Sequence, residues 1–321
     1  MVNHAEPPLA VGASPLQSSL HAATRSLHTQ LNVSIINRLP QCLPPHTSDP
    51  TAYHLGILTF GQIFVALERG INEATSNQLD NSEAGRARQS RILTTLHTPG
   101  LARTQSLKHD IDLLSERLSS LKHPRSADQF IHTEKEVKSQ ADTRTKHITQ
   151  RILKKPHLAL AYTWTMYLAL FNGGRHIHRA LARAGPDFWL ETETGQDQRI
   201  EALSFWRFNA ATEDNPEADQ LKLEFKRKFD EVSEMLTEGE QGEVVREAKG
   251  IFELCMELVE YLDGVMAEYA RQEAQVAASR DVCQRHVESK MWGGVASGFV
   301  VPLSRLLNLG WSRPFVEEGK D

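Results

Sequence analysis

The sequence predicts an all-α protein with a single folded domain and irregular ends. Apolar residues recur at three- and four-residue steps along most of the 321 residues, which is the spacing of one face of a helix. No segment alternates apolar and polar residues as a half-buried strand does. The composition, 40% hydrophobic and 24% charged, is typical of a globular domain. It excludes chains that are largely disordered, collagen-like or built on disulfides.

Three helices are expected in the first half of the chain. After a polar lead-in of residues 1–15, the first helix runs from Leu16 until Pro40 stops it. The apolar faces of the second and third helices cover residues 53–71 and 107–121, with a polar stretch between them. We expect each helix to pack its apolar face against a shared core.

The second half begins with residues 122–144, a highly charged segment that we interpret as an insertion or a solvated helix. A long apolar helix over residues 158–184 follows and contains the pair Gly173 and Gly174. Each glycine inside a helix costs about 1 kcal/mol relative to alanine. The pair therefore marks either a kink or a simple break between two shorter helices.

Two more helices complete the domain. Asn215 and Pro216 make a good helix start, because asparagine caps free backbone N–H groups and proline suits the first helical position. The final helix carries an apolar face over residues 245–262. The helical domain is expected to cover residues 16–275, which leaves residues 276–321 as a C-terminal tail.

The charge and the cysteine content limit the possible binding partners and the cellular compartment of the protein. A net charge of −5 and a pI near 6.3 argue against nucleic-acid binding that depends on overall charge. Cys42, Cys255 and Cys283 form no CxxC pair, which fits a reducing compartment. The first residues carry no signal-peptide pattern. We therefore expect an intracellular protein, either cytoplasmic or on the cytoplasmic face of a membrane.

An apolar stretch in the tail, residues 291–311, raises the question of membrane contact. Its uncharged part is shorter than the ~20 residues that span a bilayer. It could lie peripherally on a membrane surface, with Trp292 and Trp311 at the interface. It could equally fold back on the domain.

Two histidines and the glycine pair are the residues most suggestive of a ligand site. His21 and His28 are two helical turns apart, close to one face of the first helix. Imidazole is a common iron ligand, although a lone histidine on an apolar face is more often a core or boundary residue. The backbone at Gly173 and Gly174 could approach a flat ligand closely, because glycine has no Cβ.

Lys222 and Lys226 lie one turn apart on the helix that starts at Pro216. They could clamp the carboxylates of a ligand. The alternative is an ordinary solvated helix face.

Taken in order, these segments resemble the heme oxygenase family over about residues 16–264. The first helix contains LHAATRSLHTQLN, which looks like the family's proximal helix, and the second contains FGQIFVALE. The glycine pair lies in AYTWTMYLALFNGGR, which is similar to the distal helix. FWRF, LKLEFKRKF and VVREAKGIFELCMELVEYL follow with comparable spacing.

The resemblance implies a heme held between a proximal and a bent distal helix. It assigns the iron ligand to His28 and the bend over the heme to Gly173 and Gly174. The family threonine falls on Thr24. Lys222 corresponds to a family lysine near the heme propionates, and Lys226 stands where the family usually has arginine. Phe252 corresponds to a phenylalanine of the pocket wall.

The family reaction converts heme to biliverdin, carbon monoxide and ferrous iron. It requires dioxygen and electrons, which the resemblance implies come from an NADPH-dependent reductase partner. An ordered water network, anchored by a distal aspartate, normally supplies the proton.

The sequence departs from the family pattern at the distal positions. Leu170 stands at the aspartate position, and leucine has no hydrogen-bonding group to hold water. The other departures replace a glycine, an arginine and a tyrosine: Ala169, Met166 and Phe64. Asn172 and His176 are the nearby residues that could substitute as donors.

Three functions remain in view. The one we favour is a heme oxygenase that cleaves heme. The second is a heme-binding sensor, buffer or carrier on the same fold without catalysis, which the loss of the distal aspartate favours. The third is a helical scaffold whose pocket has collapsed.

Overall fold

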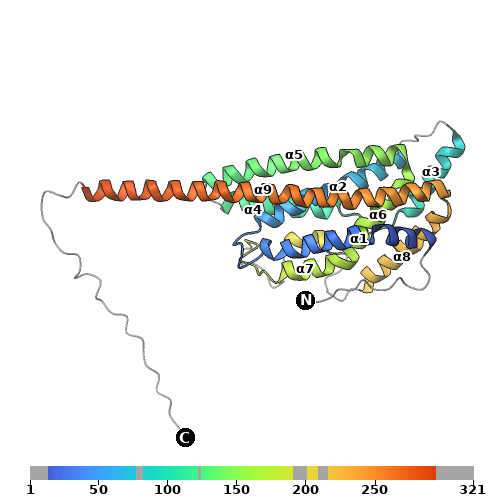
Figure 1. Ribbon diagram of the computed structural model, residues 1–321, viewed down its shortest axis with the longest axis horizontal. Helices are drawn as coiled ribbons and strands as arrows, with labels where there is room; N and C mark the ends of the chain where they lie inside the picture. Colours follow the sequence, from blue (N-terminus) through green and yellow to red (C-terminus); the bar gives the residue numbers. More distant parts are fainter. Residues whose placement is uncertain (1–13, 77–81, 122–123, 191–200, 209–215, 294–321) are drawn as a thin grey trace, which may run out of the picture. The chain divides into compact units, whose positions relative to one another are not determined.

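The computed structural model describes residues 14–76, 82–121, 124–190, 201–208 and 216–293. Within these ranges the chain is helical and has no strand, so the expected all-α fold is confirmed. The chain divides into two units, residues 1–272 and 273–321. In the second unit, the described residues are the end of the last helix. Figure 1 shows the order of the helices along the chain.

The first helix, α1 (Pro15–Arg38), starts as its sequence predicts. The Ser14 hydroxyl accepts a hydrogen bond from the backbone N–H of Gln17 at 3.4 Å, and proline occupies the first helical position. A short 3-10 turn, η1 (Leu39–Cys42), contains Pro40 and ends the helix. The core side of α1 carries Leu16, Leu20, Thr24 and Leu31.

The next helices form the packed centre of the first unit: α2 (Thr51–Ser76), α4 (Thr104–Leu121) and α5 (Pro124–Lys154). Helices α2 and α5 run in the same direction, since His54 meets Glu134 near one end and Arg69 meets Thr149 near the other. The charged segment 122–144 thus lies largely in α5. This helix buries Phe130, Val137 and Ala141 and exposes most of its charged side chains. Glu134 is an exception, since it is partly buried against His54.

The polar stretch before residue 107 contains a helix that the sequence pattern did not reveal, α3 (Glu83–Leu96). Ser82 caps its start by accepting a hydrogen bond from the N–H of Gly85. Its buried apolar residues, Ile92, Leu93 and Leu96, gather in the last turns. No repeating apolar face was therefore visible in the sequence.

The glycine pair lies in a continuous helical path. After η2 (Pro156–Leu158), the chain forms α6 (Ala159–Ala169), a π-helical turn η3 (Leu170–Gly174), and α7 (Arg175–Ala182). Gly174 keeps right-handed helical angles, φ −58° and ψ −37°. The break comes later, at Gly185, whose φ of +82° suits glycine. A π turn within an α-helix commonly marks a functional site.

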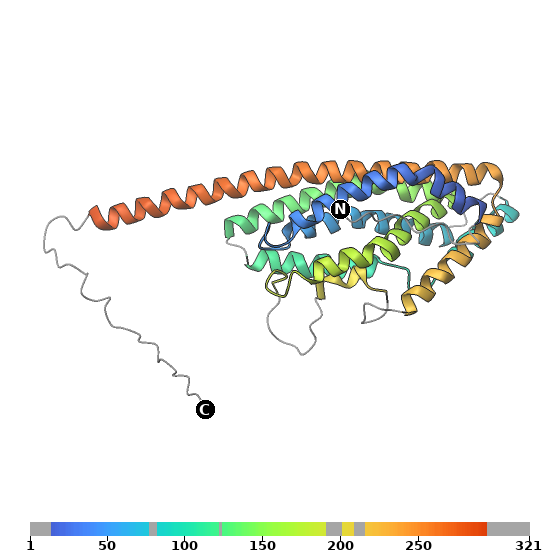
Figure 2. The same ribbon diagram turned by 60° about the horizontal axis from the view of Figure 1, so that its bottom comes forward.

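A 3-10 segment, η4 (Glu201–Trp206), precedes the last two helices, α8 (Pro216–Glu234) and α9 (Glu238–Gly293). Pro216 opens α8 as expected, whereas Asn215 lies outside the described residues. Thr237 and Glu240 exchange hydrogen bonds at the start of α9, which is a capping box. Figures 1 and 2 both show α1 lying beside the α6–α7 segment.

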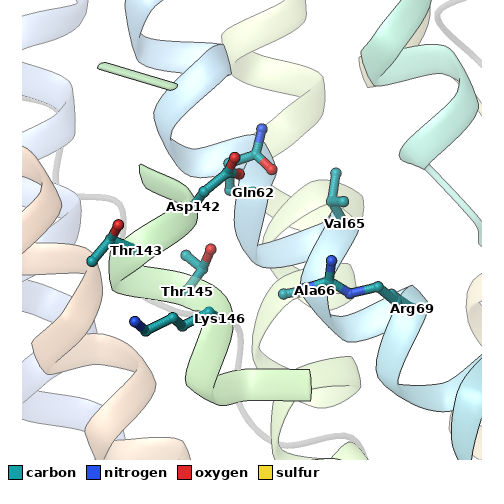
Figure 3. A pocket seen from close by; sticks show the side chains of 8 residues that line it. All are labelled: Gln62, Val65, Ala66, Arg69, Asp142, Thr143, Thr145 and Lys146. Carbon is teal, nitrogen blue, oxygen red and sulfur yellow. The ribbon is translucent and has the colours of Figure 1, made fainter. Parts of the chain in front are cut away.

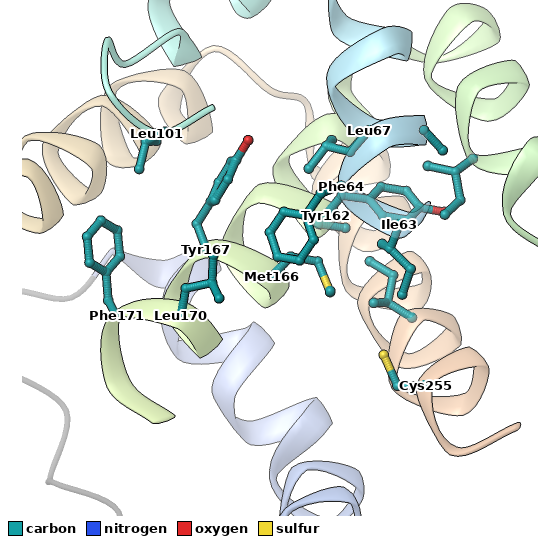
Figure 4. Close-up of a cluster of buried hydrophobic side chains, with 14 of the residues drawn as sticks. Ile63, Phe64, Leu67, Leu101, Tyr162, Met166, Tyr167, Leu170, Phe171 and Cys255 are labelled. Atoms are coloured by element: carbon teal, nitrogen blue, oxygen red, sulfur yellow. The ribbon is translucent and has the colours of Figure 1, made fainter. Parts of the chain in front are cut away.

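The main core lies where α2, α6 and α9 meet. Figure 4 shows part of it, with Phe64, Met166, Tyr167 and Leu170 among the buried side chains. Cys255 is buried there, and burial raises the pKa of its thiol to about 12. The thiol therefore stays protonated at neutral pH and acts as a packing group.

No described helix is both long enough and apolar enough to cross a bilayer. The lead-in of residues 1–13 and the side chains of the apolar stretch 291–311 lie outside what the structure describes.

Candidate functional site

His28 is half-buried on α1 and lies against α9. Its ring meets the ring of Phe252 edge-on, with centroids 5.8 Å apart and planes at 90°. Its Nε2 is 3.4 Å from the side-chain nitrogen of Asn32, one turn further along α1. The structure thus brings together two residues that the sequence assigned to one pocket.

Thr24 and His21 lie on the same helix but differ in surroundings. Thr24 is buried, and its hydroxyl donates to the carbonyl of Leu20 at 2.8 Å. This bond commits the hydroxyl hydrogen to the helix backbone, so Thr24 contributes packing. His21 is half-buried, two turns before His28.

The two glycines of the π turn have different environments. A Cβ at Gly173 would meet no atom within 4 Å. A Cβ at Gly174 would lie 3.4 Å from Cε3 of Trp206 and 3.6 Å from the Cβ of Leu170. Gly173 therefore exposes backbone beside open space, and Gly174 lies against an aromatic ring.

Trp206 is held in place by residues that the sequence analysis did not single out. Its indole Nε1 donates to the hydroxyl of Tyr53 at 2.9 Å. Asp110 fixes the rest of η4 by accepting from the backbone N–H groups of Ser204 at 3.1 Å and Phe205 at 2.8 Å, and from the Ser204 hydroxyl. Asp110 is fully buried, and this burial raises the pKa of its carboxyl to about 6.

Two polar contacts join α8 to the π turn and to the start of α7. The Lys222 amine donates to the side-chain oxygen of Asn172 at 2.6 Å. Arg175 pairs with Asp219 at 2.5 Å and so also joins α7 to α8. Partial burial lowers the pKa of Lys222, with further lowering from the charges of Lys226 and Arg175. A carboxylate placed here would relieve this repulsion.

Asn172 and His176 are both exposed, one helical turn apart. The Asn172 oxygen is engaged by Lys222, which leaves its amide nitrogen as a donor.

The sequence model of the heme oxygenase family matches residues 14–261. The chain belongs to this family. A Saccharomyces cerevisiae protein named heme-binding protein HMX1 is 25% identical over 267 residues, which cover 78% of this chain and 76% of that protein.

Two solved structures share the fold. Heme oxygenase 2 from Chlamydomonas reinhardtii, solved without heme, superposes with a TM-score of 0.53 at 22% identity and covers 77% of this chain and 97% of its own. Heme oxygenase-1 from Synechocystis, in complex with heme, gives 0.52 at 16% identity and covers 83% and 99%. At these identities the likeness establishes the fold of this heme oxygenase family member.

The buried side chains in and beside the π turn are mostly apolar. Leu170 is 5% exposed and belongs to the main core. Phe171 stacks on Phe208 with centroids 4.4 Å apart. Phe64 packs on Tyr167, whose hydroxyl donates to Glu68 at 3.1 Å. Figure 4 shows this hydroxyl directed away from Leu170 and Phe171.

Proposed function

We propose that the protein binds heme between α1 and the α6–α7 segment and cleaves it oxidatively to biliverdin, carbon monoxide and ferrous iron. The observation that carries this proposal is the open space at Gly173, on a π turn of the segment beside the helix that bears His28. The half-buried imidazole would ligate the iron, and Phe252 would fix its ring.

The charges near the π turn suit the two heme carboxylates. Partial burial and the positive charges of its neighbours lower the pKa of Lys222, which means that they disfavour its charged form. A propionate near Lys222 and Lys226 would reverse this effect, since an opposite charge favours the charged amine. Heme would thus be oriented with its carboxylates towards α8.

When bound, heme supplies the iron centre at which dioxygen is reduced and the ring is opened. Gly173 would leave room above the ring plane. Leu170 and Phe171 would exclude water from one side of the site. Asn172 and His176 are the polar residues beside the turn, and we assign to them the donation of a proton or a hydrogen bond. Electrons would come from a reductase.

A second function, heme binding without cleavage, draws on two observations. Leu170 lacks the hydrogen-bonding group that the resemblance places there, and its neighbour Phe171 stacks on the apolar ring of Phe208. The yeast relative is named as a heme-binding protein. In this case the site would sense, buffer or carry heme.

Hemin titration of the purified protein tests the binding site. We expect a Soret band with a one-to-one endpoint that His28→Ala shifts or weakens strongly. His21→Ala is the matched control, because it removes an imidazole from the same helix two turns away. An unchanged spectrum in His28→Ala together with an altered one in His21→Ala would transfer the iron ligand to His21.

Turnover separates the two functions. The hemin complex is supplied with ascorbate or a reductase, and the products are analysed for biliverdin and carbon monoxide. Biliverdin formation supports the proposal. Bleaching of heme without biliverdin, or no reaction, favours the non-catalytic function.

A further inference from the structure

A pocket of about 280 Å³ lies between α2 and α5. Figure 3 shows its side chains, with Gln62 and Arg69 from α2 and Asp142 and Lys146 from α5. None of these residues belongs to the proposed heme site.

Helix packing explains why the pocket exists. Next to it the two helices touch at Gly70, where a Cβ would lie 3.2 Å from the Cα of Thr149. One turn before this contact, the facing residues are the small Ala66 and Thr145, which leave the space between the helices unfilled. The Thr145 hydroxyl donates to the carbonyl of Ala141 and so remains tied to α5.

The amide of Gln62 indicates that this space receives a polar group. Gln62 is 8% exposed, and its side chain makes no hydrogen bond to any described residue. The two polar atoms of the amide are not enclosed by protein, so the amide is open to a polar ligand in the pocket.

Three exposed charged groups surround the pocket, and none forms an ion pair with another described residue: Arg69, Asp142 and Lys146. Arg69 uses its Nε to donate to Thr149 at 3.3 Å, and its terminal nitrogens remain for a ligand. Figure 3 shows the guanidinium and the Asp142 carboxylate on different sides of the pocket, with Lys146 beyond Thr145.

We propose that this pocket binds a small acidic amino acid, a ligand with two carboxylates and one ammonium group. Arg69 and Lys146 would each take a carboxylate, Asp142 would take the ammonium group, and the Gln62 amide would complete the hydrogen bonds. The pocket carries two positive charges and one negative charge, which is the inverse of the charges on such a ligand.

The test mixes L-glutamate, as the probe, with the full-length protein. Binding is measured by ligand-detected NMR and by calorimetry. Glutarate, which lacks the amine, and 4-aminobutyrate, which lacks one carboxylate, are the comparison ligands. We expect saturable binding of glutamate, about tenfold tighter than that of either comparison ligand. Equal binding of all three, or no saturation by glutamate at tens of millimolar, would overturn the proposal.

Two substitutions sharpen the test. Asp142→Asn should weaken glutamate binding about tenfold and improve glutarate binding, since it removes the ammonium partner and a repulsive charge. If Asp142→Asn instead weakened the binding of both glutamate and glutarate, the substitution would have damaged the pocket. That result would contradict the role assigned to Asp142. Lys146→Gln should weaken glutamate, while Lys154→Gln, the same change two turns along α5, should not. Equal effects of the two lysine variants would show that only overall charge matters.

Discussion

Trp206 packs against the backbone of Gly174, with 3.4 Å between its Cε3 and the place where a side-chain carbon would begin. This is an ordinary van der Waals distance, so a methyl group at position 174 would touch the indole ring without displacing it. The neighbouring Gly173 has no such contact. The two glycines therefore differ in their surroundings, and only a side chain at position 173 would project into open space.

Gly173→Ala should separate stability from heme binding. Because the new methyl group meets no atom, the helix should gain about 0.5–1 kcal/mol in the free energy of unfolding. The same methyl group would enter the space proposed for heme, so hemin affinity should fall. Denaturant melts and hemin titrations measure the two effects. Gly264→Ala, an exposed α9 position that is also open, should stabilise without changing hemin affinity.

The Tyr53–Trp206 hydrogen bond should contribute measurably to stability. Tyr53→Phe removes the acceptor and leaves the indole N–H without it, at a cost of about 1–3 kcal/mol. Trp206→Phe should cost more, because it also removes ring volume beside Gly174. In a double-mutant cycle from denaturant melts, the two changes should be less than additive. Full additivity would show that the two residues do not interact.

Asp110 should give the protein an unusual pH dependence. Burial raises the pKa of its carboxyl from 3.8 to about 6, so between these values the folded state binds more protons than the unfolded state. Its contribution to stability is therefore present below pH 3.8 and is lost as pH rises to about 6. At neutral pH the loss amounts to about 3 kcal/mol.

Asp110→Asn tests this, because asparagine does not titrate. Free energies of unfolding are measured for both proteins from pH 4 to 7, and the difference between them is plotted against pH. We expect wild type to lose stability relative to the variant across this range. A constant difference would show that Asp110 is ionised throughout, with its hydrogen bonds outweighing burial.

Much of the architecture could be predicted from the sequence because it rests on local periodicity. The apolar faces indicated α1, α2 and α4, and Pro216 indicated the start of α8. The α3 helix did not show, since its apolar residues are confined to its last turns. The charges of α5 concealed a buried face whose spacing is regular but whose apolar residues are few.

The site was less accessible to sequence reasoning because it depends on contacts between distant segments. Asp110 accepts a hydrogen bond from Phe205, 95 residues away, and Tyr53 accepts one from Trp206, 153 residues away. No local spacing in the sequence predicts these contacts. The Lys222–Asn172 contact is similar, since the two residues were proposed separately for different roles. His28 and Phe252 were assigned to one pocket only by the family resemblance.

Lys222→Gln should weaken hemin binding about tenfold, because it removes a charge-assisted bond to a propionate. The difference from wild type should shrink as salt is added. Arg227→Gln is the matched control: its side chain is 65% exposed on the same helix and pairs with Glu231. Equal losses in both variants would indicate a general charge effect and would remove Lys222 from the site.

Leu170→Asp addresses catalysis directly. The aspartate restores the group that the family resemblance places beside the π turn, so biliverdin formed per heme consumed should rise. Leu170 is 5% exposed, and placing a carboxyl there should lower the free energy of unfolding by about 2–4 kcal/mol. Leu170→Ala is the control, since it removes the hydrocarbon without adding a polar group. Yields are compared per bound heme, so that lost stability does not enter the ratio. If aspartate and alanine give the same yield, proton delivery does not depend on position 170, and Asn172 and His176 become the residues to replace next.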